Sequence, residues 1–329
     1  MPRRMLSILF LLTGIGAIAL GAAVLCGSSG CLSPGTQSDI LWQLRFPRSL
    51  TAFAVGGLLA LAGALMQVLL RNPLADPYVL GVSGGAAAGA MGTMMFVPAG
   101  IAAWGPQWSA HIGAFFGALF AIGLLFGLAR RALLRLAPAV ASSPSGVRLI
   151  LTGVMIASGF GALITLILSM APDTKLRGMI FWLMGDLENS LLYGPAWIVL
   201  GIALSWAIVN AARLNVLAHG DAAAQLLGVP VIRLRAMALL VASLATAGAV
   251  AVAGTIGFVG LVVPHALRLL IGNDQRILLP ASVLAGGAAL TLADLAARTV
   301  VAPTQLPVGV ITALVGVPVF LVLLTRSRS

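Results

Sequence analysis

The charged residues that could support chemistry are few in this 329-residue sequence, and they lie far apart. The clearest pair is Asp294 and Arg298, which stand four residues apart and would share one face of a helix. An ion-coupled carrier needs ionisable residues deep in the membrane, and Asp294 is the clearest candidate for that role. We interpret the two as a structural ion pair and keep ion coupling as the alternative.

Patterns typical of enzymes and metal sites are missing from the sequence. The single lysine, Lys175, stands between Thr174 and Leu176, so the chain has no phosphate-binding loop of the G-x-x-x-x-G-K-[ST] type. No Ser/His/Asp set and no His-x-x-x-His spacing indicates catalysis. We predict a protein that is not an enzyme and has neither a cofactor nor a metal site.

Two cysteines, Cys26 and Cys31, lie near the end of the first apolar run. The histidines that could complete a metal site with them, His111, His219 and His265, are distant in sequence. We interpret both cysteines as apolar residues at a helix end, and the sequence leaves open whether they form a disulfide.

The elements that must position these residues are transmembrane helices. Hydrophobic residues make up 60% of the chain and charged residues 8%, with a mean hydropathy of +1.09. Soluble domains contain about 45–50% apolar and about 25% charged residues, so a water-soluble protein is excluded. The apolar runs are continuous, unlike the alternating strands of a β-barrel. The sequence predicts an all-α polytopic membrane protein with a single transmembrane domain over residues 1–329.

Apolar runs broken by proline, glycine and charge predict ten spans. Their ranges are roughly 5–27, 47–70, 79–100, 109–129, 148–170, 192–212, 234–254, 256–271, 278–298 and 307–325. Pairs of glycines four residues apart predict close helix packing in lipid. These pairs are Gly85 and Gly89, Gly113 and Gly117, and Gly123 and Gly127.

The charges predict the topology. The net charge of +11 comes from basic residues that are spread singly between apolar runs, which is typical of topology signals and not of nucleic-acid binding. With the N-terminus inside, the cytoplasmic segments contain 14 of the 19 basic residues. An even number of spans then places both termini in the cytoplasm.

Two surfaces outside the spans are candidates for protein contacts. Between spans six and seven, residues 219–230 predict a short helix that Asp221 caps and that Gly228 and Pro230 end. Its alanines would give a slim surface able to enter a groove, although an ordinary loop helix is the alternative. On the outer side, Arg45, Arg48 and Arg298 are candidates for docking an acidic partner, or they simply anchor helix ends.

Several stretches of the sequence resemble the FecCD-type permease subunits of ABC importers, over about residues 42–324. The stretches are residues 45–48 (RFPR), 71–85 (RNPLADPYVLGVSGG), 220–230 (GDAAAQLLGVP), 257–276 (GFVGLVVPHALRLLIGNDQR) and 293–318 (ADLAARTVVAPTQLPVGVITALVGVP). Each stretch alone is weak, but together they are highly specific. The resemblance implies uptake of an iron–siderophore complex, haem or cobalamin across the bacterial inner membrane.

The resemblance also implies partners and site residues. The permease would be a homodimer with one pathway at the dimer interface, two ATP-binding cassette subunits below and a periplasmic substrate-binding protein above. Docking would use the three outer arginines named above. Coupling to the ATPase would use Gly220, Asp221, Ala224, Leu227, Gly228 and Val229. The pathway and its gate would use Asn72, Leu74, Gly146, Val147 and Arg177.

Span five, residues 148–170, and the segment to Leu187 would line the pathway, because a smooth apolar wall suits large chelates. For Arg177 a solvated loop charge is the alternative to a substrate contact. The sequence departs from the family where Gln275 replaces a frequent histidine and where Gln305 replaces a frequent acid. Asp186 and Glu188 add negative charge near the outer mouth. Two other hypotheses remain, an ion-gradient secondary carrier and an intramembrane enzyme.

Overall fold

The computed structural model describes residues 2–28, 30–31, 39–97, 106–134, 144–187 and 193–326. Nearly all of these residues are helical. The helices are α1 (Pro2–Leu25), η1 (Ile40–Arg45), α2 (Phe46–Leu70), η2 (Pro77–Leu80), α3 (Val82–Phe96), α4 (Pro106–Leu134), α5 (Pro144–Met170), α6 (Asp173–Leu183), α7 (Tyr193–Ala218), α8 (Asp221–Leu226), α9 (Val231–Ala253), α10 (Val259–Ile271), α11 (Gln275–Thr299) and α12 (Val308–Arg326). Two short strands, β1 (Cys26–Gly27) and β2 (Gly30–Cys31), pair antiparallel.

The helix α2 forms the centre of the bundle and packs against α7, α9, α10 and α11. It is apolar on all sides, which is typical of a helix that other helices surround. Glycines let its backbone approach its neighbours closely: a Cβ at Gly63 would lie 1.7 Å from the carbonyl oxygen of Gly260, and one at Gly56 would lie 2.2 Å from that of Gly286. These close approaches fix α2 against α10 and α11.

The predicted glycine pairs are confirmed in part. A Cβ at Gly89 would lie 2.1 Å from the oxygen of Gly113, and one at Gly117 would lie 2.1 Å from that of Gly85, so these four glycines form the contact between α3 and α4. At the third predicted pair, Gly123 and Gly127, an added Cβ would meet no atom of the described residues within 4 Å. Close packing at this pair therefore stays a prediction.

All ten predicted spans coincide with helices. Seven described helical stretches are long and apolar enough to cross a membrane, while α10 and the apolar part of α12, Val308–Leu323, are shorter. Helix α3 is also short, with 15 residues. The sequence did not predict α6, which occupies part of the segment after span five.

Two of the short helices follow segments that are not α-helical. Residues 254–257 before α10 have no regular secondary structure, and the 3₁₀ helix η2 with Gly81 precedes α3. Tyr78 joins the two segments: its hydroxyl donates to the Ile256 oxygen at 2.8 Å and accepts from the Ile256 nitrogen at 2.9 Å. Because non-helical backbone at membrane depth must find its partners within the protein, this bridge explains how the segment is tolerated.

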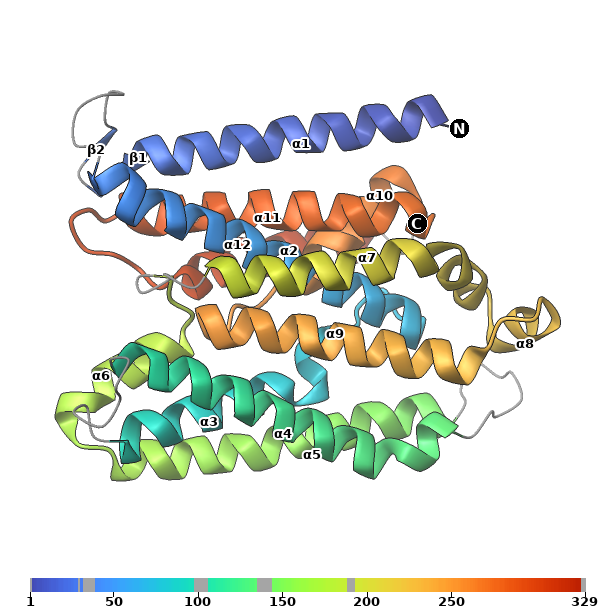
Figure 1. Ribbon diagram of the computed structural model, residues 1–329, viewed down its shortest axis with the longest axis horizontal. Coiled ribbons are helices and arrows are strands. Elements are labelled where there is room, and N and C mark those ends of the chain that lie inside the picture. Colours follow the sequence, from blue (N-terminus) through green and yellow to red (C-terminus); the bar gives the residue numbers. More distant parts are fainter. Residues whose placement is uncertain are drawn as a thin grey trace.

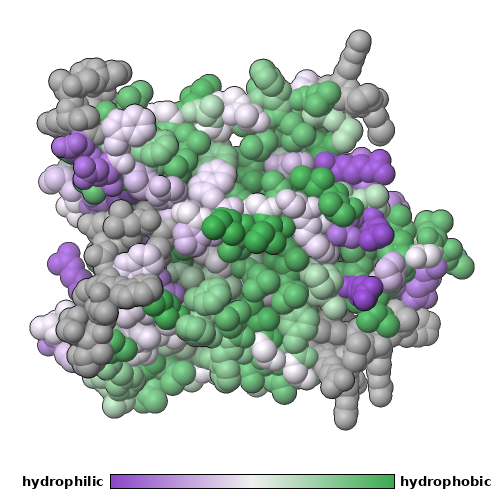
Figure 2. All heavy atoms as spheres, viewed as in Figure 1, coloured by the Kyte–Doolittle hydropathy of each residue, from purple (hydrophilic) through white to green (hydrophobic). Residues whose placement is uncertain are grey.

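The two ends of the bundle differ in what they contain. Both termini and α8 lie at one end, and β1, β2 and α6 lie at the other (Figure 1). We call these the α8 end and the hairpin end. The side view is apolar across its middle and hydrophilic toward the two ends (Figure 2). The two termini thus lie at the same end of the bundle, which agrees with an even number of spans, while their position in the cytoplasm stays a prediction.

Candidate functional site

The short helix predicted in residues 219–230 is present as α8, between α7 and α9. Gly228 has a φ of +73°, and the backbone N–H groups of Gly228 and Val229 donate to the oxygens of Gln225 and Ala224, both at 2.9 Å. This is the expected glycine stop of a helix. The predicted cap is wrong: Gly220 is the N-cap, and Asp221 is the first helical residue and makes no capping hydrogen bond.

Asp221 instead joins α8 to two long helices. Its Oδ1 pairs with Nη2 of Arg71, and its Oδ2 pairs with Nη1 of Arg235 at 2.8 Å. Arg71 ends α2 in the left-handed conformation, with a φ of 48°, and Arg235 lies in the first turns of α9. We call these three residues the Asp221 clamp. Sequence reasoning counted both arginines only as topology charges, because nothing in the spacing links residues 150 positions apart.

The outward surface of α8 and its C-cap includes two leucines beside Ala222 and Gln225. Leu226 is 89% exposed and Leu227 is 70% exposed, although both are large and apolar. Ala224 is completely buried, so the predicted slim alanine surface is wrong at that position. An exposed apolar pair at the tip of a loop is typical of a surface that another protein covers.

The Asn-Pro-Leu turn follows the Asp221 clamp directly. Asn72 Oδ1 accepts from the Leu74 backbone nitrogen at 2.9 Å, and the Asn72 oxygen accepts from the Ala75 nitrogen at 3.1 Å. Leu74 is 39% exposed. The structure describes the backbone of Gly146 and Val147 in the first turn of α5, and the side chain of Val147 lies outside the described part of the chain. The gate therefore stays a prediction. One of its parts, the Asn72–Leu74 turn, directly follows Arg71 of the Asp221 clamp.

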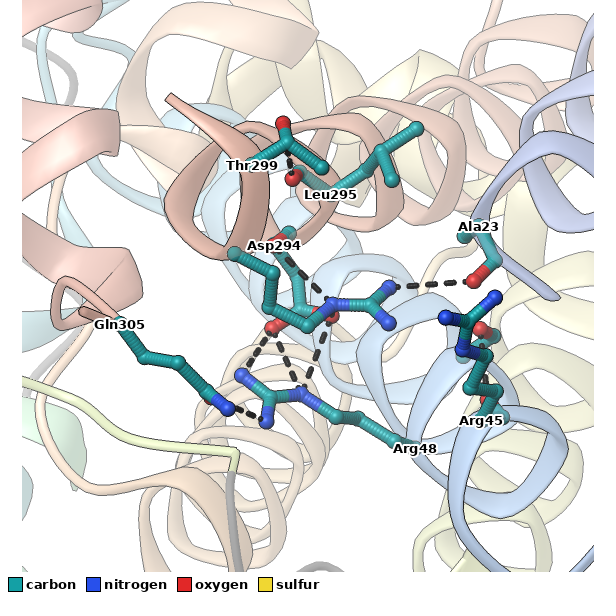
Figure 3. Close-up of polar contacts among 9 residues, drawn as sticks. Ala23, Arg45, Arg48, Asp294, Leu295, Thr299 and Gln305 are labelled. Carbon is teal, nitrogen blue, oxygen red and sulfur yellow. Dashed lines mark hydrogen bonds and ion pairs between the residues drawn. The ribbon is translucent and has the colours of Figure 1, made fainter. Parts of the chain in front are cut away.

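At the hairpin end, a buried carboxylate holds two arginines (Figure 3). Asp294 is fully buried; its Oδ1 accepts from Nη2 of Arg48 at 2.8 Å, and its Oδ2 pairs with Nε of Arg298 at 3.0 Å. Arg48 Nη1 also donates to Gln305 Oε1 at 2.9 Å, so the amide accepts a hydrogen bond where the family often has an acid. The predicted pair of Asp294 and Arg298 is confirmed within α11, and the Arg48–Asp294 pair ties α2 to α11.

The third outer arginine, Arg45, holds the end of α1. Its Nη1 donates to the Leu25 oxygen at 2.7 Å, and its Nη2 donates to the Gly30 oxygen at 3.2 Å. A disulfide joins Cys26 and Cys31 across the same hairpin, which answers the question that the sequence left open. The three arginines thus have partners within the chain and are largely buried, and a docking role for them stays a prediction.

The segment after span five contains the amphipathic helix α6. Lys175 Nζ donates to the oxygens of Met94 and Met95 at 2.9 and 3.0 Å, which satisfies the carbonyl end of α3. Arg177 is exposed, with its guanidinium carbon 5.6 Å from the ring centre of Phe181. The structure thus places Arg177 on an open surface, and its contact with substrate stays a prediction.

Helix α5 leaves one long face without contacts from the described chain. The hydroxyls of Ser158, Thr165 and Ser169 on it donate to carbonyls of their own helix at 2.8–2.9 Å. Met155 and Met170 are 70% and 62% exposed. This face is therefore apolar, with its polar groups satisfied internally, as expected for the predicted pathway wall.

Comparisons with known proteins decide the family. The model of the FecCD transport family matches residues 5–326. The chain belongs to the FecCD transport family. It is a multi-pass transport permease with the FecCD fold of about ten transmembrane helices, as the sequence predicted.

Individual relatives cover almost the whole chain. The uncharacterized ABC transporter permease protein YvrB of Bacillus subtilis is 42% identical over 92% of this chain and 83% of its own length. The vitamin B12 import system permease protein BtuC of Klebsiella pneumoniae is 37% identical over 92% of this chain and 89% of its own length. A solved structure of a metal-chelate type ABC transporter in an inward-facing conformation superposes with a TM-score of 0.85. It is 30% identical and covers 97% of this chain and 99% of that one.

Proposed function

We propose that this FecCD permease forms the membrane pathway of an ABC importer for a metal chelate such as a siderophore complex, haem or cobalamin. A separate ATPase would drive it, and a periplasmic substrate-binding protein would supply it. The observation that carries the proposal is α8, a short helix with exposed leucines that ion pairs join to the rest of the permease. A permease without a phosphate-binding loop needs such a contact with an external motor.

The Asp221 clamp would carry motion from the ATPase to the gate. Leu226 and Leu227 would enter a groove of the ATPase, and a displacement of α8 would pull on Asp221. Asp221 holds Arg71, and the next residue, Asn72, begins the turn that we predict to narrow the pathway. The end of α2, the start of α9 and the Asn72–Leu74 turn would thus move as one unit.

The exposed face of α5 would line the pathway in a homodimer. Its carbonyl-bonded hydroxyls and its methionines offer few groups that could hold a polar substrate tightly. Arg177 would meet an anionic group of the substrate at the outer mouth, since its guanidinium is exposed.

The outer arginines would attract the binding protein mainly through their charge. Two guanidinium groups pair with one carboxylate, Asp294, and that of Arg45 binds backbone oxygens nearby, so the cluster would keep a net positive charge just beneath the outer surface. An acidic partner surface would be attracted and oriented by this charge even where a direct contact is not made.

The orientation follows from the same proposal. The α8 end would face the cytoplasm, where the ATPase works, and both termini would lie there. The hairpin end would face the periplasm, whose oxidising conditions suit the Cys26–Cys31 disulfide.

Uptake measurements test the substrate class. The permease, its ATPase and its binding protein are reconstituted in proteoliposomes and offered haem, a ferric siderophore or cobalamin. We expect ATP-dependent uptake of one chelate class, competed by the unlabelled form of that class. Uptake of none of the three, with a functional complex, would contradict the proposed substrate class.

A further inference from the structure

A short hydrogen-bonded stretch of chain joins the Asn72–Leu74 turn to Tyr78 in η2. The Ala75 nitrogen donates to the Asn72 oxygen at 3.1 Å, and Asp76 Oδ1 accepts from the Tyr78 nitrogen at 2.7 Å. Each residue from the turn to Tyr78 is thus held by a close neighbour in the sequence. A displacement of the turn would therefore also move Tyr78.

The Tyr78 hydroxyl holds both backbone groups of one residue in the segment before α10. It donates to the Ile256 oxygen at 2.8 Å and accepts from the Ile256 nitrogen at 2.9 Å. Ile256 is only 1% exposed, so water cannot readily replace these bonds. We call this pair of hydrogen bonds the Tyr78 bridge. Because a sliding motion between the two segments would break at least one bond, the bridge favours movement of both segments together.

The same segment is bonded to the chain at the end of α6. Thr255 Oγ1 donates to the oxygen of Leu183, which is the last residue of α6. The Asp186 nitrogen donates to the Ala253 oxygen at 2.9 Å. Residues 253–256 are therefore bonded both to Tyr78 and to residues 183–186.

Glycines bring these backbones into direct contact. A Cβ at Gly254 would overlap the Trp182 carbonyl oxygen, and one at Gly309, in the first turn of α12, would overlap that of Met184. No side chain separates the backbones at these two points. Since close-packed interiors are poorly compressible, a displacement is passed on here and not absorbed.

We propose that Tyr78 is a positioning residue that couples the two ends of the permease. A movement of the Asp221 clamp would pass through the Asn72–Leu74 turn, the Tyr78 bridge and residues 253–256 to the end of α6, which lies at the hairpin end (Figure 1). The inner gate and the outer mouth would then change together. This inference rests on the proposed function, because the ATPase supplies the movement of α8.

Spin labels at the two ends test the coupling. The two native cysteines form a disulfide, so an introduced cysteine would be the single free thiol. Leu74→Cys reports on the turn and Met184→Cys on the end of α6, at positions that are 39% and 43% exposed. Each label is measured by electron paramagnetic resonance in the complete complex in nanodiscs, with and without a non-hydrolysable ATP analogue. In the otherwise native permease, the nucleotide should change the spectra of both labels.

Tyr78→Phe removes the bridge and keeps the ring. The response at Met184→Cys should fall about 5-fold or more, which is the lower end of typical coupling between sites, while the response at Leu74→Cys persists. Tyr193→Phe is the matched control: it removes the hydroxyl of the other tyrosine, which is 40% exposed at the start of α7, and should change neither response. A merely structural hydroxyl at Tyr78 would lower the unfolding temperature and leave both responses in place.

Thr255→Val removes the bond to Leu183 with little change of shape, and it keeps the test valid if Tyr78→Phe does not fold. It should also weaken the response at Met184→Cys. Where both variants fold, the double variant should lose little more than Tyr78→Phe alone, because the two bonds lie in one series of contacts. Such non-additivity is the direct evidence that a coupling pathway requires.

Three results would overturn the proposal. The first is a full response at Met184→Cys in every folded variant, which would leave the proposed function intact. The second is a response at Leu74→Cys but none at Met184→Cys in the otherwise native permease, which would show that the two ends move independently. The third is no response at either position, which would contradict the ATPase-driven mechanism and the coupling with it.

Discussion

Replacing Asp221 by asparagine should separate ATP hydrolysis from transport. The carboxylate is the only group that joins α8 to Arg71 and Arg235 by ion pairs, and asparagine has nearly the same shape without the charge. If the clamp carries motion to the Asn72–Leu74 turn, the variant complex should still bind and hydrolyse ATP while moving less substrate.

The stability cost should be modest. Side-chain exposure is 12% for Asp221, 32% for Arg71 and 24% for Arg235, so the pairs lie between surface and interior. Surface pairs contribute about 0.2–1 kcal/mol each, and breaking a buried pair costs about 3–5 kcal/mol. We therefore expect Asp221→Asn to cost about 1–3 kcal/mol. A coupling free energy of similar size would lower uptake per ATP by roughly 5- to 150-fold.

The assay compares uptake and phosphate release by the same proteoliposomes. Asp274→Asn is the matched control, since Asp274 lies at the same end, accepts from Asn215 at 2.7 Å and caps α11 through Arg276 N at 3.0 Å. Asparagine caps a helix about as well as aspartate, so this control removes a negative charge at the same end of the bundle while the cap is kept. Uptake per ATP should stay normal in this control. Normal uptake per ATP in Asp221→Asn would refute a role of the clamp in coupling.

Three other substitutions test other parts of the structure. Asp294→Asn should destabilise the permease by about 3–5 kcal/mol, measured by thermal unfolding, because two buried guanidinium groups lose their charge partner; a change below 1 kcal/mol would contradict a structural role. Joint replacement of Leu226 and Leu227 by aspartate should leave folding intact and reduce ATPase binding in a pull-down, and unchanged binding would exclude α8 as the contact. Gly63→Ala should prevent folding, judged by gel filtration, because its Cβ would meet the Gly260 oxygen at 1.7 Å; a well-folded variant would show that α2 and α10 can separate.

The sequence was sufficient to predict most of the helices and an even number of membrane spans. Long apolar runs specify spans, and basic residues mark their ends, so α1, α2 and α9 could be predicted from local pattern alone. Helix α8 was also predictable, because Gly228 and Pro230 give it a local stop. The amphipathic α6 was missed, because its charged and polar residues interrupt the apolar run.

The contacts of the charged residues were mostly not predictable. The pair Asp294–Arg298 has a helical spacing and was found, whereas Arg48 reaches Asp294 from 246 positions away. Burial of the outer arginines follows from how α1, α2 and α11 meet, and no local pattern contains that information. The cysteine pair was ambiguous for the same reason, since its geometry depends on the hairpin that Arg45 holds.

The central claim, that this permease is driven by an external ATPase, is tested most directly by uptake into proteoliposomes with and without that ATPase. With the binding protein and a loaded chelate on the outer side, uptake should require both the ATPase subunits and ATP, and an imposed proton or sodium gradient should not replace them. Uptake by the permease alone, driven by an ion gradient and lost in folded Asp294→Asn protein, would contradict the claim and support a secondary carrier.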